Sequence, residues 1–67
     1  MKDFLTIREK EIFKLLINNY STDEIASTLN ISKKTVRNHI SNVIQKLGVK
    51  NRSQAIIELI KINNINI

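Results

Sequence analysis

The sequence predicts an all-α fold, a compact domain of four helices with a central helix-turn-helix, and three observations support this class. Three segments place a capping residue three positions before a glutamate or glutamine. Apolar residues then recur with the period of an amphipathic helix. The 67 residues include no proline and one glycine, and no alternating pattern suggests a pair of strands. We therefore expect one domain over residues 1–67. The three segments are Thr6 to Glu9, Ser21 to Glu24 and Asn51 to Gln54.

The first helix is expected over about residues 7–18. Thr6 can cap its backbone while Glu9 reaches back to complete a capping box. Ile12, Leu15 and Leu16 follow at helical spacing. The nearby acid Glu11 is a candidate partner for a cation that faces the interior, and the two cations considered are Arg37 and Lys46.

The second helix is short and is expected to end near Asn30. Ser21 and Glu24 repeat the capping pattern, and apolar residues follow. Asparagine tolerates the left-handed conformation that commonly ends a helix.

The third helix is expected from the cap Ser32 to Leu47, because Gly48 follows and glycine commonly closes a helix. About three residues separate it from the second helix, which is the separation expected of a helix-turn-helix.

This third helix has three chemically different sides when about 100° is taken per residue. Its apolar stripe contains Val36, Ile40, Val43 and Leu47, and its opposite side contains Lys34, Arg37, Asn38, Ser41 and Gln45. Thr35, His39, Asn42 and Lys46 occupy a flank between them. From the second and third helices and the turn between them, we expect the core to include Ile25, Ala26, Leu29, Ile31, Val36, Ile40, Val43 and Leu47.

The fourth helix, expected over about residues 52–62, follows the third capping pattern and is apolar over more of its surface than one core contact requires. Its stripe of Ala55, Leu59 and Ile62 can face the core. We expect the outer isoleucines to make a two-fold dimer contact, the alternative being scattered surface residues. They are Ile56, Ile57 and Ile60, joined by Ile65 and Ile67 of the tail.

Composition favours a polyanionic partner and argues against catalysis. Eleven lysines and arginines against six acids give a net charge of +5. The chain lacks cysteine, and His39 alone cannot build a metal site. No glycine loop or nucleophile–base pair suggests an enzyme, and we expect no cofactor. No apolar window suits a membrane span, and the cations lie over several helices, so we expect a cytoplasmic protein that does not bind membranes.

Three segments together resemble the LuxR-type helix-turn-helix family, the output domain of many bacterial regulators. They are LTIREKEIFKLL, STDEIASTLNISKKTVRNHISNVIQKLGV and KNRSQAI, and the resemblance covers about residues 5–60. It implies a nucleoid-associated regulator of transcription, activator or repressor, that binds double-stranded DNA as a homodimer with its third helix in the major groove. The likeness is strong to a stand-alone member that regulates late spore-coat genes.

The resemblance, together with the angular positions around the third helix, assigns base contacts to four outward residues. They are Lys34, Arg37, Asn38 and Ser41. Arg37 stands where many members have lysine, and arginine can contact guanine with two hydrogen bonds. Hydroxyls, cations and helix N-termini supply the phosphate candidates, of which Ser32 and Thr22 are also candidate caps. These candidates are Thr22, Ser32, Lys33, Thr35, His39, Asn42, Lys46, Lys50 and Arg52.

Two alternatives stay open. One is an excised output domain of a two-component response regulator, and the other is a polymerase-interaction module like region 4 of sigma factors. An activator also needs a surface for RNA polymerase, which the first helix or the turn at residues 18–20 could supply. The family often has glycine in that turn, where this chain has Asn18, Asn19 and Tyr20.

Overall fold

The computed structural model describes residues 5–62, and these form four α-helices without a strand. The helices are α1 (Ile7–Ile17), α2 (Thr22–Leu29), α3 (Lys33–Leu47) and α4 (Arg52–Lys61). The all-α prediction is confirmed. The predicted end residues Asn18, Asn30 and Ile62 are the C-caps that directly follow α1, α2 and α4.

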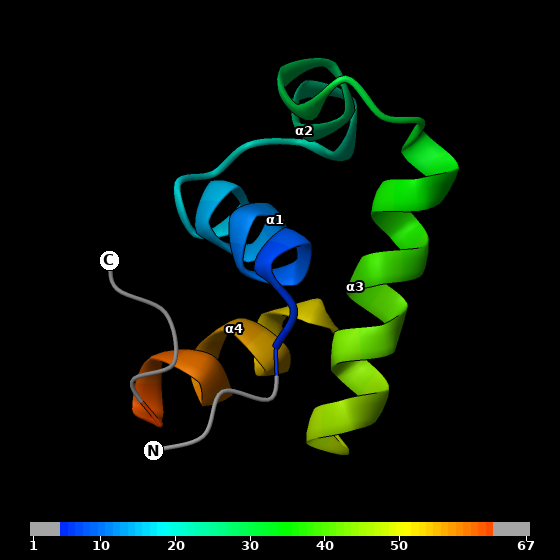
Figure 1. The fold of residues 1–67 in the computed structure, drawn as a ribbon. Helices are drawn as coiled ribbons and strands as arrows, with labels where there is room; N and C mark the ends of the chain where they lie inside the picture. The colour runs from blue at the N-terminus through cyan, green and yellow to red at the C-terminus, as the bar shows by residue number, and fades with distance from the viewer. Residues whose placement is uncertain (1–4, 63–67) are drawn as a thin grey trace.

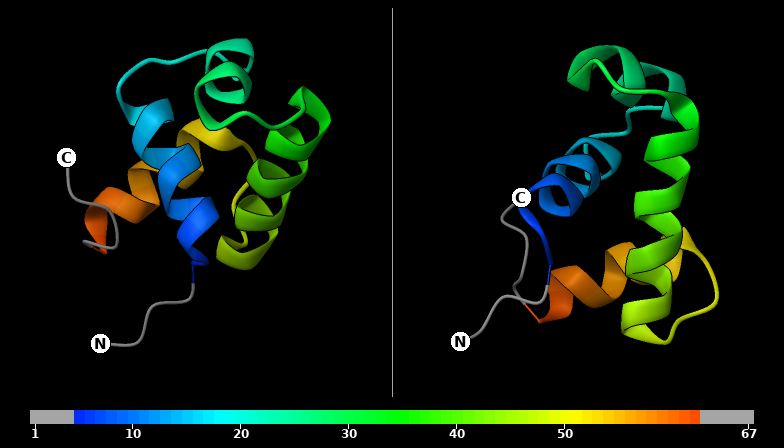
Figure 2. Two further views of the ribbon diagram at one scale, coloured as in Figure 1. Left: turned by 45° about the horizontal axis from the view of Figure 1, so that its top comes forward. Right: turned by 45° about the vertical axis from the view of Figure 1, so that its right-hand side comes forward.

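The longest helix, α3, runs along one side of the molecule and packs against the other three (Figure 1). The short helix α2 lies near its N-terminal end, and α4 lies near its C-terminal half, with α1 between them (Figure 2). One side of α3 is therefore covered by protein, and the other is left to solvent.

Two complete capping boxes begin α1 and α2, as predicted. The hydroxyl of Thr6 accepts from the Glu9 N–H at 3.1 Å, and Oε1 of Glu9 accepts from the Thr6 N–H at 2.9 Å. Ser21 and Glu24 make the same two bonds, at 3.1 and 2.8 Å. Thr22 is the first residue of α2 and not its cap, because Ser21 holds that position.

The third capping pattern is only half formed. Oδ1 of Asn51 accepts from the Gln54 N–H at 2.9 Å, so Asn51 does cap α4. The side chain of Gln54 reaches past the cap and accepts from the Lys50 N–H, also at 2.9 Å. A reciprocal box is therefore absent at this end of the described chain, and the extra bond ties the preceding residue to the helix.

Three residues within the range 5–62 adopt a positive φ, and each ends or follows a helix. Asn30 ends α2 at φ 58° and Gly48 ends α3 at φ 69°, as predicted. Asn19 takes φ 69° in the turn after α1, which is the conformation that glycine would favour there. A Cβ on Gly48 would meet nothing within 4 Å, so the backbone conformation, not space, favours glycine.

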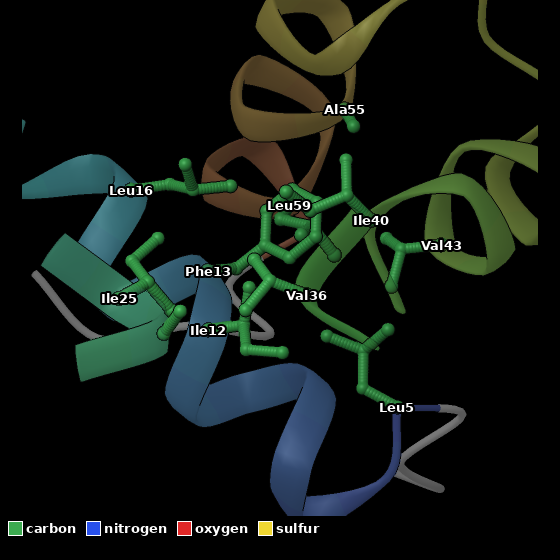
Figure 3. Packing of buried hydrophobic residues seen from close by; sticks show 11 residues of the cluster. Leu5, Ile12, Phe13, Leu16, Ile25, Val36, Ile40, Val43, Ala55 and Leu59 are labelled. Carbon is green, nitrogen blue, oxygen red and sulfur yellow. The ribbon is translucent and has the colours of Figure 1, made fainter. Parts of the chain in front are cut away.

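All four helices contribute to one hydrophobic core (Figure 3). Five predicted core residues are buried, namely Ile25, Ala26, Val36, Ile40 and Val43. The other three, Leu29, Ile31 and Leu47, are partly buried and pack against the cluster. The remaining buried apolar residues are Leu5, Ile12, Phe13, Leu16, Ala55 and Leu59.

Within residues 5–62, no helix has the length and apolar character needed to cross a membrane.

Candidate nucleic-acid interface

The outward side of α3 carries four exposed polar side chains on its N-terminal two-thirds. Within residues 5–62, none of these side chains takes part in a hydrogen bond or ion pair of the protein. Their donors and acceptors are therefore available to another molecule. The four residues are those predicted to contact bases, Lys34, Arg37, Asn38 and Ser41.

The N-terminal end of α3 is organised by two hydroxyls. Oγ of Ser32 accepts from the Thr35 N–H at 3.0 Å, so Ser32 caps the helix as predicted. The two hydroxyls of Ser32 and Thr35 also share a hydrogen bond of 2.9 Å. On the same flank, His39 is half-buried and Asn42 is exposed. This end of α3 thus presents hydroxyls and backbone N–H groups, which suit an anion.

Beside this end, Lys33 forms an exposed ion pair with Asp23 of α2. The atoms Nζ and Oδ1 are 3.4 Å apart, and the aspartate side chain is 76% exposed. Such a pair contributes little to folding, because water screens both charges. Lys33 can therefore leave Asp23 for a phosphate at small cost.

The opposite end of α3 is followed by two more exposed cations. Lys50 lies in the turn and Arg52 is the first residue of α4. A fifteen-residue helix is about 22 Å long. The phosphate candidates thus lie at both ends of the outward side of α3, about that distance apart.

Lys46 occupies a different environment, in the last turn of α3. Its Nζ donates to Oε1 of Glu9 over 2.7 Å. The Glu9 side chain is only 4% exposed. Burial raises the pKa of Glu9. Hydrogen bonds from Lys46 and Thr6, together with the charges of Lys46 and His39, lower it by more than burial raises it. The pKa of Glu9 therefore lies below its ordinary value.

This pairing corrects one sequence prediction. Glu11 does not meet an interior cation. It pairs with Arg8 on the surface at 3.3 Å, while Arg37 is exposed.

The capping box with Thr6 is enough to account for a glutamate at position 9. The sequence therefore does not reveal that Glu9 also pairs with Lys46, 37 residues away. The signal was the helical spacing: Glu9 stands three and four residues before Ile12 and Phe13, on the buried side of α1.

The isoleucines of α4 divide into two kinds. Ile57 is 57% exposed and Ile60 is 39% exposed. Ile56 is half-buried and packs against the protein's own core, so less of it is available to a second molecule. Ile65 and Ile67, also predicted for the dimer contact, lie outside the described residues.

No group of three or more metal-ligating side chains occurs within residues 5–62.

Comparison with known proteins shows what the chain is similar to. The model of the family described as bacterial regulatory proteins, luxR family, matches residues 3–59. Spore germination protein GerE of Bacillus subtilis is 58% identical over 66 residues, covering 98% of this chain and 89% of that protein. The transcriptional regulatory protein DegU of Brevibacillus brevis is 49% identical over 57 residues, covering 85% of this chain and 24% of that protein.

Two solved structures share the fold. The structure of transcription factor GerE superposes with a TM-score of 0.93 and covers 97% of both chains. The response regulator ChrA of a heme-sensing two-component system superposes with a TM-score of 0.88 at 35% identity, and the match covers 97% of this chain and 32% of ChrA. The chain thus spans nearly the whole of one relative and only a fraction of the others.

Proposed function

Because the chain belongs to the luxR family of bacterial regulatory proteins and is a DNA-binding transcription regulator of the LuxR type, we propose that it acts as a homodimer on a pseudo-palindromic DNA site. In this proposal α3 of each copy lies in the major groove. Two half-sites then stand about 34 Å apart, one turn of the double helix.

The outward side of α3 carries the proposal. Its four exposed side chains are unpaired within the described part of the chain, and they include the donors and acceptors that read base edges. Arg37 is the residue best suited to a guanine, through two parallel hydrogen bonds. The four proposed base contacts are Lys34, Arg37, Asn38 and Ser41.

The proposed phosphate contacts surround this side. Ser32 and Thr35 stand at the N-terminal end of α3, and Lys50 and Arg52 follow its C-terminal end. Such contacts set the position of the protein on DNA without reading its sequence. The further phosphate contacts in the proposal are Thr22, Lys33, His39 and Asn42, whereas Lys46 is already held by Glu9.

The dimer contact is proposed on α4, around Ile57 and Ile60. Both are exposed on a helix whose other side, with Ala55 and Leu59, is buried. Two exposed isoleucines on one short helix favour a self-complementary patch that a second copy covers through a two-fold axis.

We infer a role in late sporulation, at spore-coat genes, from the similarity to GerE, which extends over nearly the whole of both chains. An activator would also contact RNA polymerase, and the exposed Tyr20 beside Asn19 in the turn after α1 is our candidate surface. This role would place the protein in the cytoplasm, on the nucleoid. The similarity to DegU supports a second candidate, the output domain of a response regulator.

Two experiments test these proposals. Selection of binding duplexes from a random library by the purified chain should yield a pseudo-palindrome with half-sites one helical turn apart. A single unrepeated half-site would contradict the dimer. Genome-wide mapping of bound sites in the native host should then place these sites beside spore genes, and their absence there would contradict the sporulation role.

A further inference from the structure

The ion pair between Glu9 and Lys46 joins two helices that the helix-turn-helix alone does not connect. Glu9 lies in the first turn of α1, outside the helix-turn-helix, and Lys46 lies in the last turn of α3. The two residues are 37 positions apart in the sequence, and their charged atoms are 2.7 Å apart. The pair therefore ties the C-terminal end of α3 to the start of α1.

The two partners are unequally buried, and this makes the pair hard to open. The side chain of Glu9 is 4% exposed, against 36% for Lys46. A buried carboxylate is costly unless it is paired and hydrogen-bonded. Oε1 of Glu9 accepts from two donors, Nζ of Lys46 and the Thr6 N–H. Removing the lysine would leave a buried charge with only one of these donors.

Each charge also suits its own helix end. A carboxylate near an N-terminus and a cation near a C-terminus are both stabilised by the helix dipole. Glu9 and Lys46 occupy those positions in α1 and α3. The pKa of Glu9 is lowered overall, so the carboxylate is ionised at neutral pH.

We propose that Glu9 is a positioning residue for α3, the helix that enters the major groove. By holding Lys46, Glu9 fixes the position of α3 against α1 and keeps the Lys46 charge away from DNA phosphates. This inference rests on the proposed placement of α3 in the major groove. It removes Lys46 from the phosphate contacts that its position on the helical wheel predicted.

Comparison with Lys33 shows why the two lysines differ. The partner of Lys33 is Asp23, which is 76% exposed, so water solvates that carboxylate when the lysine moves to a phosphate. When Lys46 moves, Glu9 stays buried without it. Phosphate contact therefore costs little at Lys33 and much at Lys46.

The salt dependence of binding to a random-sequence duplex, followed by fluorescence anisotropy, separates these roles. Each lost phosphate contact flattens the slope of log K against log salt by about 0.9 per bound copy. K33M should show this change, whereas the double variant E9Q/K46M should keep the wild-type slope.

Thermal unfolding and sequence preference test the positioning. K46M, which leaves the buried Glu9 carboxylate without its cation, should lower Tm by at least about 10 °C, while R8M, the same kind of change in the surface pair with Glu11, should lower it by less than about 4 °C. The double variant carries no unpaired buried charge and should remain folded. Its preference for the selected site over random DNA should fall about fivefold, because the base-contacting side chains of α3 are no longer held in a fixed position.

Two results would overturn the inference. One is a slope for E9Q/K46M that is flatter by about 0.9, which would make Lys46 a phosphate contact. The other is an unchanged site preference in that variant, which would reduce the pair to a stabilising role. If K46M alone does not fold, the double variant and K33M still decide. Failure of the proposed groove placement would appear separately, as normal base preference in a variant that lacks Arg37.

Discussion

Substitution of Arg37 by alanine tests the proposed reading side most directly. Arg37 is exposed on α3 and, within residues 5–62, has no hydrogen bond or ion pair to lose. The free energy of unfolding should therefore change by less than about 0.5 kcal/mol. Any larger effect on DNA binding must then come from contacts made with DNA, because the folded protein does not use this side chain.

The size of the binding effect follows from one arginine in each half-site. A guanidinium that contacts a guanine with two hydrogen bonds contributes about 1–3 kcal/mol of discrimination. A symmetric dimer would lose this twice, so the full selected site should be bound about 2–6 kcal/mol more weakly. Preference should relax at one base pair in each half-site and at no other position.

The assay is competition binding with a panel of duplexes that carry single base changes in the selected site. Arg8→Ala is the matched control, since it removes the same charge from a surface position on α1. Equal losses on the selected site and on random DNA would refute the assignment, because they would show a phosphate contact or a general charge effect.

The remaining predictions concern stability and assembly. Val36→Phe should cost about 1–3 kcal/mol in urea unfolding, because the wild-type side chain is fully buried. Gly48→Ala should cost about 1 kcal/mol, since Gly48 has φ 69° and the added methyl group meets no neighbour; a loss above about 2 kcal/mol would contradict this reason. The pKa of Glu9 is lowered in the folded state, so its stabilisation is complete above the ordinary value of 4.5 and is lost as the pH falls through the lowered value. The difference in unfolding free energy between wild type and Glu9→Gln should accordingly shrink on acidification below pH 4.5, and a constant difference would exclude this linkage. Ile57→Lys with Ile60→Lys should leave the fold intact, because both side chains are exposed, and should abolish the dimer in sedimentation equilibrium on duplex DNA; a dimer that survives would place the contact elsewhere.

Local features of the fold were predictable from the sequence because they depend on neighbouring residues. Thr6 with Glu9 and Ser21 with Glu24 form their boxes inside four-residue segments. The left-handed ends at Asn30 and Gly48 are likewise properties of single residues. Helix bounds followed from these signals to within one residue.

The candidate site was partly predictable for a related reason. Helical periodicity alone places Arg37 on the opposite side of α3 from Val36, and the structure shows the first exposed and the second buried. The same periodicity could not show that Ile56 is partly buried against the core while Ile57 and Ile60 are exposed. The buried fraction of each side chain depends on how α4 crosses its neighbours.

The sequence by itself determined four helices, their caps and the outward side of α3, since each follows from contacts within a few residues of the chain. Only the tertiary structure decided that Lys46 pairs with Glu9, and that Glu11 stays with Arg8 on the surface. The physical reason is that an ion pair across 37 residues exists only where packing brings two helix ends together and excludes water from the carboxylate. The sequence shows which charges are present, and the packing of α1 on α3 decides which of them is buried.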